Sequence, residues 1–139
     1  YNQSVISCAN TTMTPLLMDS EKLDSDNMHD TSSNQARITF TTAGTYYIQM
    51  VARTAAANAE WALYMLEGDG PVWLYRNTLH LTNSVAHTQQ VSAILTRSAA
   101  SYISMNMWQN SGSSQNVENW TGAGSYSMPR TYMLAFRIA

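Results

Sequence analysis

The stretch Ile38-Thr39-Phe40-Thr41-Thr42-Ala43-Gly44-Thr45-Tyr46-Tyr47-Ile48-Gln49-Met50 decides the fold of this chain, because two alternating runs flank a glycine. Alternation of apolar and polar residues at a period of two is typical of half-buried strands. The set expected to face a core is Ile38, Phe40, Tyr46, Ile48 and Met50, and the set on the opposite face includes Thr39, Thr41, Tyr47 and Gln49. The stretch therefore predicts a β-sandwich with one buried face and a second face left for a partner.

The rest of the chain has the same character, with short apolar runs between turn signals and no sustained helical period. Gly68-Asp69-Gly70-Pro71 and Asn110-Ser111-Gly112-Ser113-Ser114 are strong turn signals. Residues 112–128 form the longest irregular stretch and are expected to make an exposed loop. The predicted strands cover residues 4–7, 14–18, 36–41, 45–54, 60–67, 72–76, 79–82, 89–95, 101–109 and 130–138.

About ten short strands in one domain need two packed sheets, since a single open sheet of that size would expose a whole apolar face. We therefore expect residues 1–139 to form a single all-β domain, an antiparallel two-sheet jelly roll. Alternation also assigns faces within the last two strands. Residues expected to point inward are Ile103, Met105, Met107, Tyr132, Leu134, Phe136 and Ile138, and those expected on the reverse are Tyr102, Ser104, Asn106, Trp108, Met133, Ala135 and Arg137.

Charged residues make up only 12% of the 139 residues, about half the usual share, while Ser, Thr and Asn are abundant. Such a neutral, polar surface suits a packed assembly or a particle exterior, and it also suits an ordinary extracellular β domain. Cys8 is the only cysteine, so no internal disulfide can form. A lone cysteine is usually a small buried hydrophobe, and we expect that role here.

The net charge of −2 and the single lysine, Lys22, provide no basic stripe for a phosphate backbone, so nucleic-acid binding is not expected. No apolar run approaches the roughly 20 residues of a membrane-spanning helix, so no membrane role is expected. The chain begins at Tyr1 without a leader-like segment, which indicates that something upstream was removed or not included.

The one concentration of possible metal ligands is the acidic segment that contains Asp19, Glu21, Asp24, Asp26 and Asp30, with His29. It lacks the glycine and glutamate positions of an EF-hand and has too few histidines for zinc. We expect its carboxylates to accept hydrogen bonds from nearby backbone N–H groups and fix a turn. No nucleophile elbow, metalloprotease motif or phosphate-binding loop is present, so the sequence predicts no enzyme, no catalytic residue, no metal and no cofactor.

Aromatic residues are the remaining candidates for recognition, because an indole ring combines a large apolar face with one hydrogen-bond donor. Trp61 and Trp73 lie within predicted strands and are expected to be packed. Trp120, in the Gly- and Ser-rich loop, is the best candidate for an exposed contact, together with Asn116 and Asn119. A packing role for a loop tryptophan remains the alternative.

The phrase Thr42-Ala43-Gly44-Thr45-Tyr46-Tyr47 resembles the glycine–tyrosine strand of the C1q and tumour-necrosis-factor-like jelly rolls. The segment Met18-Asp19-Ser20-Glu21-Lys22-Leu23-Asp24-Ser25-Asp26-Asn27-Met28-His29-Asp30-Thr31 is similar to one that recurs in C1q-like domains of tailed-phage structural proteins, where it also precedes an Arg-Ile-Thr strand. The similarity continues through residues 102–112 and 131–138 and so covers nearly the whole chain. One departure is Ser98-Ala99-Ala100-Ser101, where the family usually has a Gly-Asp turn.

This resemblance implies a compact homotrimer whose interface is the outer face of one sheet, including the glycine–tyrosine strand and the last strand. On the matching positions it places Tyr47, Gln49, Met133 and Ala135 near the threefold axis. These neutral residues suit an interface, because charged groups are depleted from interface centres. The alternative is that they are scattered surface residues.

Three functions are consistent with the resemblance. The first is a phage structural protein on the virion surface, a capsid decoration (cement) or head-fibre protein whose partners are its own copies and other virion proteins such as the major capsid protein. The second is a receptor- or carbohydrate-binding head domain of a tail fibre, with a host surface glycan as partner. The third is a cellular C1q-like extracellular ligand-binding domain. The segment Asp24 to Asp30 favours the phage classes, and a resemblance that leaves little room for a stalk favours decoration.

Overall fold

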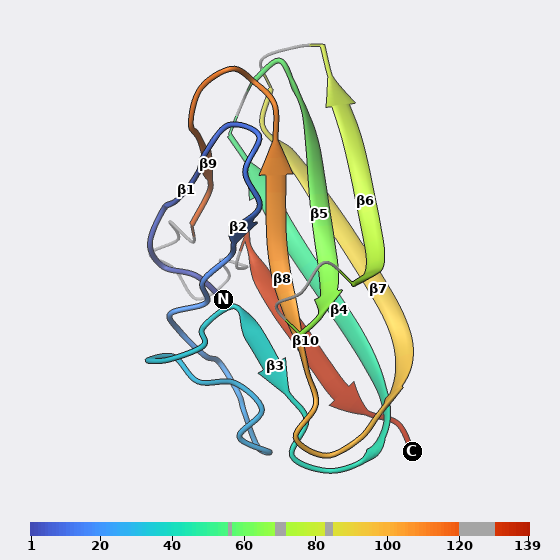
Figure 1. The fold of residues 1–139 in the computed structure, drawn as a ribbon. Helices are drawn as coiled ribbons and strands as arrows, with labels where there is room; N and C mark the ends of the chain where they lie inside the picture. The colour runs from blue at the N-terminus through green and yellow to red at the C-terminus, as the bar shows by residue number, and fades with distance from the viewer. Residues whose placement is uncertain (56, 69–71, 83–84, 120–129) are drawn as a thin grey trace.

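The computed structural model describes residues 1–55, 57–68, 72–82, 85–119 and 130–139, and in these ranges it contains strands and turns but no helix (Figure 1). No helix able to cross a bilayer is therefore present in those ranges. The strands are β1 (Ile6–Cys8), β2 (Thr14–Pro15), β3 (Arg37–Thr39), β4 (Gly44–Thr54), β5 (Ala59–Glu67), β6 (Trp73–Leu81), β7 (His87–Arg97), β8 (Tyr102–Gln109), β9 (Gln115–Val117) and β10 (Tyr132–Arg137).

These strands form two antiparallel five-stranded sheets that pack face to face (Figure 1). In the first sheet β4 is central, with β7 along one side and β9 and β10 along the other, and β1 pairs with β9. In the second sheet β2 and β3 both pair with β8, followed by β5 and β6. The all-β, two-sheet prediction is confirmed.

The core between the sheets is built from the residues that alternation assigned to it. Tyr46, Ile48 and Met50 of β4 are at most 1% exposed, as are Ile103, Met105 and Met107 of β8. Methionines contribute much of this core, and their unbranched side chains fill irregular gaps between the sheets. Cys8 is also fully buried, as expected, and burial raises the pKa of its thiol to about 11.

Gly44 begins the long central strand because the end of the chain passes directly over it. A Cβ at this position would lie 2.7 Å from the carbonyl oxygen of Ala139 and would collide with the side chain of Arg137. Thr45 completes the contact, since its N–H donates to Ala139 O at 2.7 Å. The glycine of the Gly-Thr-Tyr-Tyr phrase therefore permits close approach of two backbones.

Two strand predictions differ from the structure. Residues 73–81 form one continuous strand, β6, where the sequence suggested two short strands. Gln115–Val117 form β9 inside the region expected to be a loop, and Val117 is fully buried.

Candidate functional site

The outer face of the first sheet carries an apolar surface at its centre. Cross-strand pairing brings Phe136 of β10, Tyr47 of β4 and Ile94 of β7 into one row. The rings of Tyr47 and Phe136 are tilted against each other with centroids 5.2 Å apart, a typical aromatic contact. The next row contains Leu134 and Gln49, and Gln49 Oε1 accepts a hydrogen bond from the Tyr132 hydroxyl at 3.4 Å.

Several large apolar side chains on this face are accessible to solvent. Ile94 is 62% exposed, Ile138 49%, Phe136 48% and Leu134 42%. We call Tyr47, Ile94, Leu134, Phe136 and Ile138 the outer apolar face. Single exposed apolar residues are ordinary, but a contiguous group is typical of an interaction site.

The face assignment for the last strand was wrong. Met133 and Ala135 are half-buried and pack against the core, whereas Leu134, Phe136 and Ile138 point outward. Residues paired across two strands share a face, and Met133 pairs with the core residue Met50, as Ala135 does with Ile48. Nearly every residue of this strand is apolar, so the sequence offered no contrast that could fix its orientation.

Of the four residues predicted near a threefold axis, the structure therefore places two on the outer face. Tyr47 and Gln49 lie there, half-buried by their neighbours. Sequence reasoning missed Leu134 and Phe136, whose assignment required the pairing register with β4.

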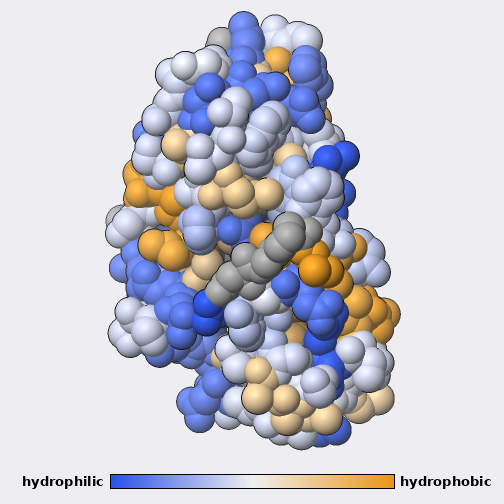
Figure 2. Space-filling model, in the orientation of Figure 1, coloured by the Kyte–Doolittle hydropathy of each residue, from blue (hydrophilic) through white to orange (hydrophobic). Residues whose placement is uncertain are grey.

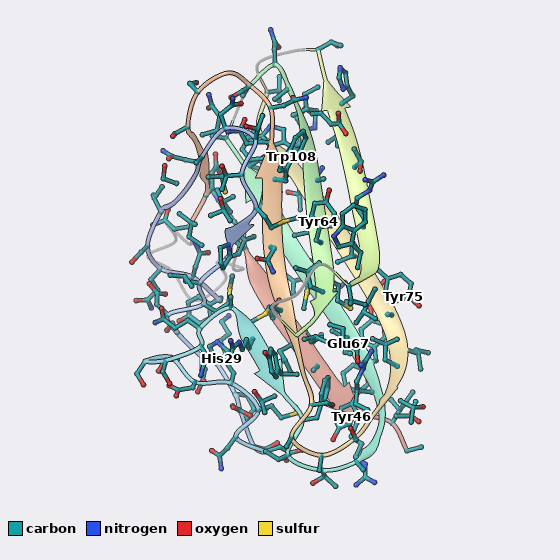
Figure 3. The ribbon with its side chains drawn as sticks, in the orientation of Figure 1. His29, Tyr46, Tyr64, Glu67, Tyr75 and Trp108 are labelled. Atoms are coloured by element: carbon teal, nitrogen blue, oxygen red, sulfur yellow. The ribbon has the colours of Figure 1, made fainter. Side chains whose placement is uncertain are left out.

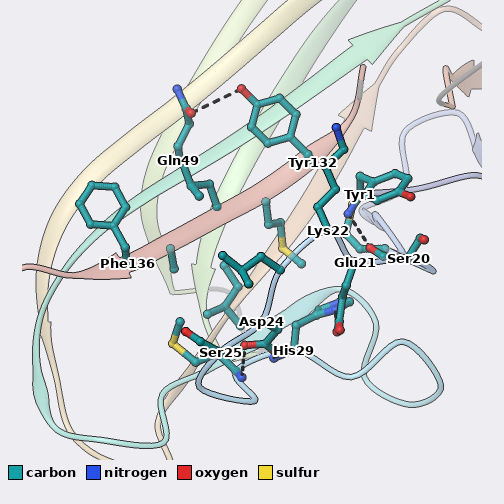
Figure 4. A pocket seen from close by; sticks show the side chains of 17 residues that line it. Tyr1, Ser20, Glu21, Lys22, Asp24, Ser25, His29, Gln49, Tyr132 and Phe136 are labelled. Atoms are coloured by element: carbon teal, nitrogen blue, oxygen red, sulfur yellow. Dashed lines mark hydrogen bonds and ion pairs between the residues drawn. The ribbon is translucent and has the colours of Figure 1, made fainter. Parts of the chain in front are cut away.

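A pocket of about 490 Å³ lies beside β10, between this strand and the segment of residues 18–29 (Figure 4). Figure 4 shows Tyr132 and Phe136 on the strand side and Asp24, Ser25 and His29 on the segment side. Most of its lining is apolar, with contributions from Met18, Leu23, Met28, Ile38, Met133, Leu134, Ala135 and Phe136.

The acidic segment that walls this pocket is held by its own carboxylates. Asp24 accepts hydrogen bonds from the backbone N–H groups of Met28 (3.0 Å) and His29 (2.9 Å). Asp30 accepts hydrogen bonds from Ser32 and Ser33, and these bonds lower the pKa of Asp30. The predicted turn-forming role of this segment is confirmed.

His29 adds a second connection within the same segment. Its Nδ1 lies 2.9 Å from Glu21 Oε1 and its Nε2 lies 3.0 Å from the carbonyl oxygen of Gln35. Over the described ranges, no group of three or more His, Cys, Asp or Glu side chains is placed to hold a metal ion.

The structure describes two of the three recognition residues suggested by the sequence. Asn116 is exposed on β9. The side-chain amide of Asn119 is engaged internally, donating to Gln3 O at 2.6 Å. Trp120 lies outside the described residues.

The outer face of the second sheet carries a smaller apolar cluster, formed by Ala62, Tyr64 and Leu66 of β5 with Met13 and Trp108 packed against them. Figure 2 shows that the side turned to the viewer is largely polar or neutral, with apolar groups in small separate clusters. Tyr64, at the centre of β5, is 6% exposed and packs 5.5 Å from the ring of Trp73 (Figure 3). Trp73 itself is 56% exposed, so its expected burial was wrong. The guanidinium of Arg76 lies 5.8 Å from the Trp73 ring centre, within cation–π range.

Solved structures identify this architecture. The chain is similar to the globular domain of zebrafish complement 1qA protein, with a TM-score of 0.60, 14% identity and 97% of each chain covered. It is also similar to the Eiger TNF of S. frugiperda, with a TM-score of 0.63 and 11% identity, covering 97% of this chain and 85% of that one. No family model and no curated protein matches the sequence. The fold is therefore the C1q/TNF-like jelly roll.

Proposed function

We propose that this protein is a non-enzymatic, homotrimeric jelly-roll module that serves as a structural protein on the surface of a phage particle. The observation that carries the proposal is the outer apolar face, where Leu134, Phe136 and Ile138 are each more than 40% exposed. At about 25 cal/mol per Å² of apolar surface removed from water, a face of this kind favours association over exposure to solvent.

The position of the face supports closed self-assembly. It occupies the surface of the sheet around β4 and β10, while another exposed aromatic residue, Tyr75, lies on β6 at the edge of the second sheet. Contact between different patches on neighbouring copies is heterologous, and such contacts close into rings when the rotation permits. Three copies of this chain around one axis would bury each outer apolar face.

The virion role is supported by composition and by the acidic segment. A surface with few charged residues suits permanent contact with other proteins, such as the major capsid protein. The segment from Met18 to Thr31, similar to phage C1q-like domains, forms a wall fixed by Asp24 and His29.

A ligand-binding head domain is the second candidate, favoured by the exposed Trp73 with Arg76 beside its ring. An indole face and a guanidinium are suited to the apolar and hydroxyl surfaces of a host glycan. Glycan-array binding that is lost in Trp73→Ala and retained in Phe136→Asp would support this function.

Sedimentation equilibrium at micromolar concentration tests the assembly. We expect a mass of about 46 kDa, three times the 15.5 kDa of one chain. Phe136→Asp places a charge in the outer apolar face and is expected to give a folded monomer. Val5→Asp, at a residue 54% exposed elsewhere on the surface, is the matched control and should remain trimeric. A wild-type monomer would contradict the proposed assembly.

A density map of intact particles tests the location. Density for this fold on the capsid surface would support the decoration role. Density restricted to the distal tip of a tail would contradict that role and favour the head-domain alternative.

A further inference from the structure

Within the described ranges β4 is the only strand paired with β10, and residues of the other edge of β10 line the pocket described above. Ile138 N donates to Thr45 O at 2.8 Å, which fixes the phase of the ladder between β10 and β4. In an antiparallel pair, alternate residues of one strand bond to the partner and the others point away. The peptide groups of Tyr132, Leu134 and Phe136 therefore face β4, and those of Met133 and Ala135 face the opposite edge.

A contact at the start of β10 supports this phase. Thr131 O accepts a hydrogen bond from Asn2 N at 3.3 Å on the edge away from β4. Beyond this contact, none of the described residues forms a hydrogen bond to the backbone of Met133 or Ala135 on that edge. An unpaired edge is a template for another strand, and natural proteins block it with charged side chains, proline, a bulge or a covering loop. β10 contains neither lysine nor proline.

The space in front of this edge is shaped like a slot. Met18, Met28 and Ile38 contribute an apolar lining, and the segment of residues 18–29 forms the facing wall (Figure 4). The hydrogen bonds of Asp24 and His29 hold that wall in place. The slot is therefore preformed, and its methionines can adapt to different side chains.

We propose that the edge of β10 binds an extended peptide segment of a partner protein, which adds to the first sheet as a further strand. The row of N–H and C=O groups at strand spacing is matched only by another extended backbone, and the apolar lining receives alternate side chains.

NMR titration of the whole protein with synthetic peptides tests this site. The probes are three capped seven-residue peptides in which threonine alternates with valine, leucine or phenylalanine. We expect at least one to bind saturably, moving the amide protons of Met133 and Ala135 downfield and slowing their exchange at least tenfold. Amides of Leu134 and Phe136, which already bond to β4, should shift less. Absence of any response at Met133 and Ala135 with all three peptides at millimolar concentration would overturn the proposal.

N-methylation of the peptide separates strand addition from simple apolar binding. Methyl groups on alternate nitrogens block one hydrogen-bonding edge of the peptide, and the other alternate set blocks the opposite edge. We expect one methylated isomer to lose at least tenfold in affinity while the other binds like the parent peptide. Equal binding by both isomers would overturn strand addition.

A variant of the protein provides a second readout. Ala135→Pro removes an N–H that points to the open edge, a position where a strand tolerates proline, and should abolish peptide binding with the melting curve still cooperative. Ala135→Gly retains the N–H and is the control that should still bind. Unchanged binding by a folded Ala135→Pro variant would count against the site, and the N-methyl comparison decides the question if that variant does not fold.

Discussion

At the scale of single residues, Ala100 adopts a conformation that its side chain disfavours. Its φ is 64°, in the turn where the resembled family usually has Gly-Asp. The turn is held by hydrogen bonds from Ala100 N to Phe40 O (2.7 Å) and from Ser101 N to Ser98 O (3.3 Å). The left-handed region costs an L-residue roughly 1–2 kcal/mol, so this position stores conformational strain.

We predict that Ala100→Gly raises the free energy of unfolding by about 0.5–1 kcal/mol, the relief of strain less the extra flexibility of glycine in the unfolded chain. Denaturant unfolding measures the change. Ala99→Gly is the control, because Ala99 is not among the residues with positive φ. This variant should lose about 0.5 kcal/mol of unfolding free energy. A loss of stability in Ala100→Gly equal to that of the control would contradict the turn geometry.

Burial of Cys8 makes stability depend on alkaline pH. The folded-state pKa of about 11 lies above the ordinary value of 9.0, chiefly because desolvation disfavours the thiolate. The contribution of the protonated thiol to the free energy of unfolding is complete below pH 9 and is lost as the pH rises toward 11. The loss amounts to roughly 2–3 kcal/mol. The free energy of unfolding, measured between pH 8 and 11, should fall more steeply with rising pH for the wild type than for Cys8→Ala. Parallel pH profiles would show that the thiol is not buried as described.

At the scale of elements, the sequence assigned the core face correctly in strands whose apolar residues alternate with polar ones, such as β4. The alternation in β4 and β8 correctly identified Ile48 and Met105 as core residues. β10 is apolar on both faces, so only its register with β4 reveals that Met133 faces inward. The candidate site was therefore only half predictable, because the inward and outward sets of β10 were exchanged.

The short strand β9 was missed because its sequence, Gln115-Asn116-Val117, has a single apolar residue. Its partners are distant in sequence, with Val117 paired to Ile6 and Thr54. Asn and Gln have low strand propensity, and tertiary pairing overrides it here.

Val117→Ala tests whether β9 closes the core. Val117 is fully buried, and we expect its truncation to cost about 1–2 kcal/mol of unfolding free energy. Asn116→Ala, at the exposed neighbouring position, should change stability by no more than about 0.5 kcal/mol. Equal small effects at both positions would mean that the region behaves as the loop the sequence suggested.

At the scale of the whole molecule, β10 contributes to two adjoining surfaces. Its outward side chains, Leu134 and Phe136, belong to the outer apolar face proposed to join copies of the chain. Its free backbone edge, at Met133 and Ala135, opens into the pocket proposed to hold a partner's peptide. Leu134 and Phe136 also line that pocket, so a copy at the outer apolar face and a peptide at the edge would contact some of the same residues.

The most direct test of the central claim is the solvent accessibility of Phe136 by fluorine NMR. The chain contains only two phenylalanines, and the other, Phe40, is fully buried and serves as an internal reference. With fluorophenylalanine at both positions, we predict that Phe136 is as protected from solvent as Phe40 in the wild type. In Leu134→Asp we expect Phe136 to become accessible while Phe40 does not. A wild-type Phe136 signal that remains exposed to solvent at high protein concentration would contradict the claim that this face is buried between copies.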